Sequence, residues 1–165
     1  MARMYCGALG KRGNCQIGVS VNLASEKASS AIDWRLFIPE SWDDAKHGDD
    51  PLMAGAIVRR RAQAKIPDEE RHREKWRLAL DMLDEVTGEW GLPGLPVTAD
   101  AGYGDATGFR QGLTYRGLLY AVAVNATTSA QQPADAEPAR APYRGRGPPR
   151  PPPTRTNQVT FANSP

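Results

Sequence analysis

The sequence predicts an α/β domain with a layered sheet, followed by a tail of different composition. Three patterns support this prediction: two segments in which apolar residues alternate, a segment with apolar residues at helical spacing, and an apolar run of strand length. The chain has 165 residues, which is enough for one domain with a real core. In chain order the patterns give a hairpin, helices, a strand, a helix and a strand.

The two alternating segments predict a β-hairpin. Apolar residues occupy every second position over 16–23 and again over 31–38, which is the period of half-buried strands. The polar residues between the segments suit a hairpin connection, so we expect antiparallel neighbours. In the second strand the alternation places one face outward and one inward, and Pro39 ends the strand. The residues of the apolar face are Ile32, Trp34, Leu36 and Ile38.

Two helices are expected after the hairpin. Residues 52–64 predict a basic helix, and Pro67 followed by three acids predicts the start of a second one, with acids favourable to the helix dipole. The second helix has an apolar face at helical spacing, and Gly88 and Gly91 are both candidate stops. The residues of that face are Trp76, Ala79, Leu80, Leu83, Val86 and Trp90.

The segment "LPVTAD" predicts a short strand that ends at Asp100. Asp105 is expected to cap a helix over "ATGFRQGLTYRG", with Phe109 and Leu113 facing inward. Residues 118–125 are apolar on both faces, which is typical of an interior parallel strand.

Asp100 is the candidate catalytic and metal-binding residue. In open α/β sheets, ligands bind beyond the carboxyl ends of the strands, where we expect this carboxylate. Gly102 and Gly104 would leave room for a substrate. Mg²⁺ takes one or two protein carboxylates together with substrate phosphates. The residue pattern alone favours the structural alternative, in which the acids cap a turn and a helix.

The charge distribution points to a second candidate site. The net charge of +2 is too small to indicate a nucleic-acid partner. Residues 57–80, however, hold eight Lys or Arg against four acids, and Arg59, Arg60 and Arg61 are candidate contacts to DNA phosphates. The remaining acids of the hairpin and loops are expected to be solvated, the histidines to lie on the surface and the tryptophans to pack in the core or at its rim. These residues are Asp33, Glu40, Asp43, Asp44, His47, His72, Trp34, Trp42, Trp76 and Trp90.

Composition limits the other classes of protein. Cys6 and Cys15 fit neither a disulfide framework nor a metal-ligand spacing, so we expect free thiols and a cytoplasmic location. We identify no signal peptide and no apolar run long enough for a membrane span. Residues 131–165 are rich in Pro and Arg and predict a disordered tail, which leaves residues 1–130 as the folded domain.

Several linked segments together resemble a known family. They are "YCGALGKRGNCQIGVSVNLASEKASSAIDWRLFIPESW", "IPDEERHREKWRLALDML", "TADAGYGDATGFRQGL" and "YAVAVNATTSA". In this order they are similar to the DDE-superfamily endonuclease domain of bacterial insertion-sequence transposases, from about Tyr5 to about Gly147. The resemblance implies an RNase-H-like mixed sheet with flanking helices, cleavage and strand transfer of DNA at transposon ends, and Mg²⁺ or Mn²⁺ held by two Asp and one Glu. Asp100 matches the second of these acids.

The chain also departs from the family pattern. The first aspartate belongs on a strand before Tyr5 and the glutamate on a helix beyond Asn125, and we find neither. We therefore expect an incomplete fold that lacks the first strand and the C-terminal helix, and a truncated transposase that is inactive alone. The alternative is a non-catalytic remnant that binds DNA or protein. The two hypotheses differ in whether another chain supplies the absent acids. Besides DNA, a second copy of the chain is a candidate partner.

Overall fold

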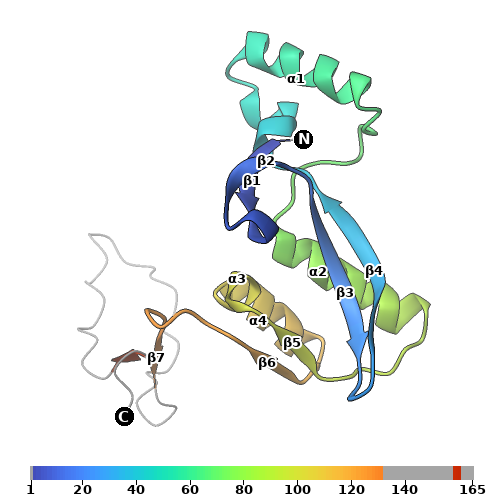
Figure 1. The fold of residues 1–165 in the computed structure, drawn as a ribbon, viewed down its shortest axis with the longest axis vertical. Coiled ribbons are helices and arrows are strands. Elements are labelled where there is room, and N and C mark those ends of the chain that lie inside the picture. Colours follow the sequence, from blue (N-terminus) through green and yellow to red (C-terminus); the bar gives the residue numbers. More distant parts are fainter. Residues whose placement is uncertain (1, 132–157, 161–165) are drawn as a thin grey trace, which may run out of the picture.

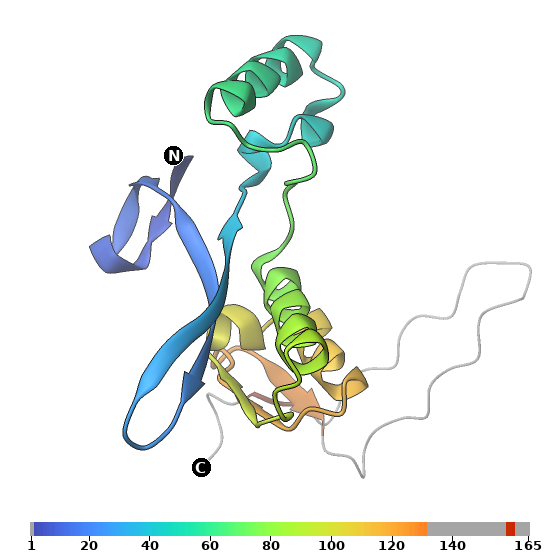
Figure 2. The ribbon, with the colours of Figure 1, turned by 90° about the vertical axis from the view of Figure 1, so that its right-hand side faces the viewer.

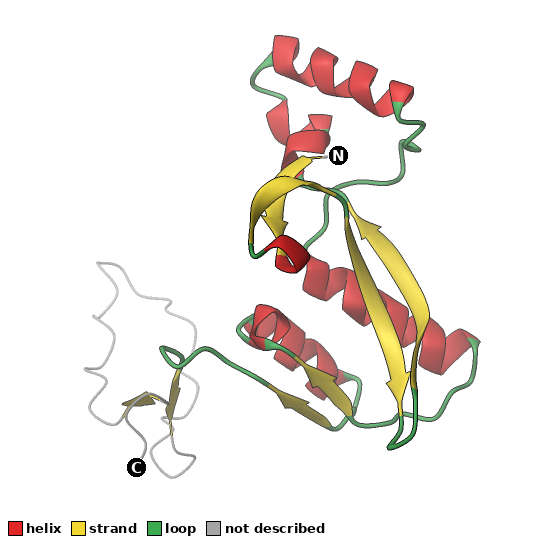
Figure 3. Cartoon of the chain, in the orientation of Figure 1, coloured by secondary structure: helices red, strands yellow, loops and turns green. Residues whose placement is uncertain are grey.

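The computed structural model describes residues 2–131 and 158–160 and shows a mixed α/β fold (Figure 1). Figure 3 separates its helices from its strands. The described strands form small separate sheets, three antiparallel and one parallel, and do not join into one continuous sheet. This confirms the predicted fold class and is consistent with an incomplete RNase-H-like sheet. The pairs are β1 (Ala2–Cys6) with β2 (Lys11–Cys15), β3 (Ile17–Ala24) with β4 (Ser29–Phe37), β5 (Val97–Ala99) with β6 (Tyr120–Val122), and β7 (Ser129–Gln131) with β8 (Gln158–Thr160).

The predicted hairpin is confirmed as β3 and β4, but the buried face of β4 is opposite to the one expected. Val19 lies opposite Arg35 and Val21 opposite Asp33, and residues directly opposite share a face of the sheet. Arg35 and Asp33 therefore lie on the same inward-facing side of the hairpin as Val19 and Val21. Trp34 remains 67% exposed, so its expected packing role is wrong.

Ion pairs stabilise the charged residues on the inward-facing side of β4. Asp33 is buried and receives a bond of 2.5 Å from Arg35, which also pairs with Glu85. A buried charge is costly unless it is paired and hydrogen-bonded. The expectation that Asp33 is solvated is therefore wrong, because the hairpin register carries it inward.

The first predicted helix is confirmed as α1 (Pro51–Gln63), which follows the short 3-10 turns η2 (Glu40–Trp42) and η3 (Asp44–His47). The Asp50 carboxylate caps it by accepting from the Met53 backbone N–H at 3.0 Å. Figures 1 and 2 both place α1 at one end of the molecule, away from α4.

The second helix begins later than predicted. It is α2 (Lys75–Asp84), so the acids after Pro67 lie outside it. Long-range bonds hold the intervening segment out of helical geometry: Arg61 donates to the Pro67 and Glu70 carbonyls, and the His72 backbone N–H donates to Asp43. A π-helical turn, η4 (Glu85–Glu89), continues the helix, and Gly91 follows it with a φ of 67°.

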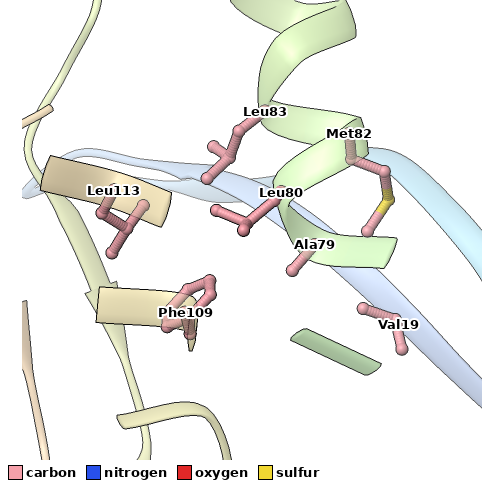
Figure 4. Close-up of a cluster of buried hydrophobic side chains, with 7 residues drawn as sticks. All are labelled: Val19, Ala79, Leu80, Met82, Leu83, Phe109 and Leu113. Carbon is pink, nitrogen blue, oxygen red and sulfur yellow. The ribbon is translucent and has the colours of Figure 1, made fainter. Parts of the chain in front are cut away.

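The hydrophobic core lies on both sides of α2, which packs on β3 and β4 and on α4 (Thr107–Tyr115). Phe109 and Leu113 of α4 are buried there, as predicted. Gly112 allows the close approach of the helices, because a Cβ at this position would clash with Leu80. Figure 4 shows the cluster, which is Val19, Ala79, Leu80, Met82, Leu83, Phe109 and Leu113.

The last predicted strand is parallel, as expected, but not interior. β6 pairs with β5 along Val97–Ala99, and among the described strands it has no second neighbour. Tyr120 is 38% exposed, so this strand is apolar in composition but is not buried on both faces. Of the predicted tail, 131–165, the structure describes Gln131 and residues 158–160, and the rest lies outside the described residues. None of the described helices has the length and apolar character needed to cross a bilayer.

Candidate functional site

Asp100 follows β5 directly and begins a one-turn helix, α3 (Ala101–Gly104), where a glycine turn was expected. Its Oδ1 accepts from the Gly102 backbone N–H at 3.0 Å, so the carboxylate caps this helix. The residue is exposed, and within the described residues its Oδ2 makes no hydrogen bond. Asp100 is thus fixed by one oxygen and free to bind a ligand with the other.

The glycines beside Asp100 serve the packing of α3. A Cβ on Gly104 would lie well inside van der Waals contact with the Ala123 carbonyl oxygen. A Cβ on Gly102 would lie 3.1 Å from Oδ1 of Asp100 and would crowd the capping carboxylate. The structure therefore explains both glycines by close approach within the chain, and a substrate is not needed to account for them.

Asp105 does not cap the following helix, which corrects the expectation. Helix α4 has Ala106 at its N-cap position and no side-chain cap. The Asp105 carboxylate instead accepts from the Asn125 backbone N–H at 2.9 Å, from the Asn125 side chain and from the Thr128 hydroxyl at 3.2 Å. It connects the end of α3 to the segment after β6.

We expect Asp105→Ala to free the segment after β6 without unfolding the domain. The Asn125 backbone N–H would lose its acceptor and open to solvent more often. Hydrogen exchange followed by mass spectrometry should show faster exchange in peptides that contain residues 123–128. Asp49→Ala, an exposed acid with no described hydrogen bond, is the matched control. Equal exchange in both variants would contradict this role.

Tyr103 lies beside Asp100, and sequence reasoning did not select it. Its ring packs against Phe109 with ring centroids 5.6 Å apart. Burial raises the pKa of Tyr103, and the negative charge of Asp100 raises it further. The sequence indicates only that a tyrosine follows Asp100 within the same turn. The direction of the Tyr103 side chain depends on the fold.

Asp43, near α1, is structural, which corrects the expectation that it is solvated. Asp43 is 3% exposed and accepts from the backbone N–H groups of Ala45 at 3.2 Å and His72 at 2.9 Å. Burial acts to raise the pKa of Asp43, but these two donors and Arg71 outweigh it and hold the pKa below its ordinary value. His72 is half-buried as well, with Nδ1 2.8 Å from the Ile38 carbonyl oxygen.

The three candidate DNA-binding arginines have different environments. Arg59 is exposed and takes part in none of the ion pairs of the described residues. Arg60 is also exposed; it stacks 4.6 Å from the Trp42 ring centre and donates to the Ser41 carbonyl. Arg61 is 2% exposed and bonds to carbonyls of the chain, so its guanidinium is not available to a phosphate.

Within the described residues, no group of three or more His, Cys, Asp or Glu side chains is arranged to hold a metal ion. Asp100 therefore offers a single carboxylate rather than a complete site. One carboxylate can be one of several ligands of Mg²⁺, but it cannot fix a pair of ions.

The chain was compared with known proteins. A family model described as DDE superfamily endonuclease matches residues 1–163. No curated protein and no solved structure matches the chain.

Proposed function

The chain belongs to the DDE superfamily endonucleases, and from this premise we propose that it acts in DNA transposition as part of an insertion-sequence transposase. Endonucleases of this superfamily generally depend on divalent metal ions. Their substrate is DNA. The proposal assigns Asp100 as one acid of the metal-binding site.

The position of Asp100 is the observation that supports the assignment. It is an exposed carboxylate at the carboxyl end of β5, a strand parallel to β6. Ligands of α/β sheets bind at such ends. The cap to Gly102 restrains the carboxylate, and its second oxygen can enter the coordination sphere of Mg²⁺ or Mn²⁺.

We further propose that the chain alone does not cleave DNA. The described residues supply one suitable carboxylate, and the buried Asp33 and Asp43 are already engaged in ion pairs. A cleavage site of the two-metal type needs acids that hold both ions about 4 Å apart. Residues other than those described, or a second chain, would have to contribute them.

Metal binding at Asp100 can be tested without relying on activity. Paramagnetic Mn²⁺ is expected to broaden the NMR signals of the Gly102 amide and the Tyr103 ring in the wild-type chain. Asp100→Asn should strongly reduce this broadening, because the neutral amide is a weaker ligand than the carboxylate. Asp49→Asn, at an exposed acid in a different loop, is the control and should broaden like wild type.

Cleavage is tested in parallel with supercoiled plasmid and Mg²⁺ or Mn²⁺. We expect no nicking above background for the wild-type chain. Nicking that Asp100→Ala abolishes would contradict the proposed inactivity and strengthen the assignment of Asp100. Broadening that is unchanged in Asp100→Asn would refute the assignment itself.

A non-catalytic role in DNA binding is the second candidate function. The exposed side of α1 favours it, because Arg59 and Arg60 lie there without a carboxylate partner among the described residues. Such arginines can bind phosphate, and the contribution is strongly salt-dependent. Arg61 is excluded from this surface by its burial.

A further inference from the structure

The β1–β2 ribbon has one face that is entirely exposed. Arg3 lies opposite Asn14, and Tyr5 lies opposite Arg12, so the four side chains share this face. All four residues are exposed, and Tyr5 is 64% exposed. We call these four residues the outer ribbon face. Figure 2 shows the ribbon projecting from the β3 end of the hairpin, away from α2 and α4.

The opposite face of the ribbon is turned toward the rest of the molecule. Ala2, Met4 and Cys15 line an apolar hollow beside the end of β4. The outer ribbon face points away from this hollow, and none of its four residues lines it. The other residues of the hollow are Gln16, Leu36, Phe37, Ile38, Pro39, Trp42 and Ile66.

The cations of the ribbon have no carboxylate partner in the part of the chain that the structure describes. Residues 1–25 contain no Asp or Glu. Within the described residues Arg3, Lys11 and Arg12 form no ion pair. Six other arginines among the described residues do pair with a carboxylate, namely Arg35, Arg61, Arg71, Arg73, Arg77 and Arg116. Among the described residues, the positive charge of the ribbon is therefore not neutralised by a carboxylate.

We infer that the outer ribbon face contacts the sugar-phosphate backbone of duplex DNA. Arg3 and Arg12 can each bind a phosphate through a planar guanidinium, and Asn14 and Tyr5 add neutral donors of the kind that contact phosphate oxygens. A two-stranded ribbon is also narrow enough to enter the major groove. The inference rests on the proposed function for its choice of DNA among polyanions, and it adds a binding surface separate from Asp100 and α1.

The test measures DNA binding of the full chain by fluorescence anisotropy. A labelled mixed-sequence duplex is titrated at KCl concentrations between about 50 and 200 mM. The ribbon variant is Arg3→Gln with Arg12→Gln. Its control is Lys27→Gln with Lys46→Gln, which removes the same charge from exposed residues that form no described ion pair. A third variant, Arg3→Lys with Arg12→Lys, keeps the charge and loses only the guanidinium.

We expect the ribbon variant to bind DNA about tenfold to a hundredfold more weakly than the wild-type chain. The slope of log Kd against log[KCl] should be smaller by about 2. The control should stay within about twofold of wild type, and the lysine variant should keep the wild-type salt slope. Melting curves that match wild type would show that the ribbon variant is folded, as expected for exposed side chains.

Three results would overturn the inference. If the ribbon variant binds DNA like the control, the ribbon is not the contact, while DNA binding and the proposed function stand. If polyglutamate binds the outer ribbon face as tightly as DNA does, the partner is an acidic protein. If the wild-type chain binds no DNA, the inference fails, and the Mn²⁺ experiment on Asp100 then decides the proposed function independently.

Discussion

Replacing Arg61 by methionine is expected to lower the free energy of unfolding by about 2–5 kcal/mol. The guanidinium is buried and donates to the carbonyl oxygens of Trp42 at 2.9 Å, Pro67 at 2.8 Å and Glu70 at 2.7 Å. Methionine would fill much of the space but would donate to none of these three acceptors. Because domains are stable by only about 5–15 kcal/mol, the loss should be visible in any unfolding experiment.

Arg59→Met is the matched control for this prediction. It removes the same charge two positions away, from an exposed side chain without a described ion pair, and should change the stability by less than about 0.5 kcal/mol. Urea unfolding followed by tryptophan fluorescence measures both variants. In DNA titrations the order should reverse, with Arg59→Met weakening binding through lost phosphate contact. A stability loss in Arg59→Met equal to that in Arg61→Met would contradict the division of roles.

Replacing Gly104 by alanine is expected to have the second large effect, a loss of about 2–4 kcal/mol in the free energy of unfolding. The new Cβ would clash with the backbone carbonyl of Ala123, just after β6. Because the clashing atom belongs to the backbone, a change of side-chain rotamer cannot relieve the clash. The clash would be relieved by moving α3 away from β6. This movement would also shift Asp100, which lies between β5 and α3. Thermal unfolding monitored by circular dichroism would measure the loss.

Gly48→Ala is the control for the alanine itself. Gly48 has φ −64° and ψ −19°, a conformation open to any residue, and a Cβ there would meet nothing within 4 Å. It should be neutral or slightly stabilising, by up to about 1 kcal/mol, because alanine restricts the unfolded chain. If Gly104→Ala unfolds at the same temperature as Gly48→Ala, the close contact between α3 and β6 is not present in solution.

The charged residues near α1 show why function was harder to predict than structure. Arg59, Arg60 and Arg61 are adjacent and chemically identical, so their side-chain chemistry does not distinguish them. Successive residues of a helix point in different directions, and only the third faces the carbonyls of the segment after α1. Their separation into binding and structural roles therefore required the packing of α1 against residues distant in sequence.

The same limit applies around Asp100. Its place after a short strand could be predicted, because the strand has its own pattern and the acid follows it. The partner of Asp105 could not, since Asn125 and Thr128 lie some twenty residues away and approach only when β6 aligns with β5. A capping role was the local alternative, and the distant donors displaced it.

The sequence by itself determined the existence and order of the main elements: the hairpin, α1, the apolar face of α2, the strand before Asp100, and α4 with its inward Phe109. These follow from the spacing of apolar side chains, which each segment carries within itself. Only the tertiary structure decided which face of β4 is buried, where α2 begins and which arginine is enclosed. Those outcomes depend on strand register and on hydrogen bonds between distant segments, and neither is encoded in local spacing.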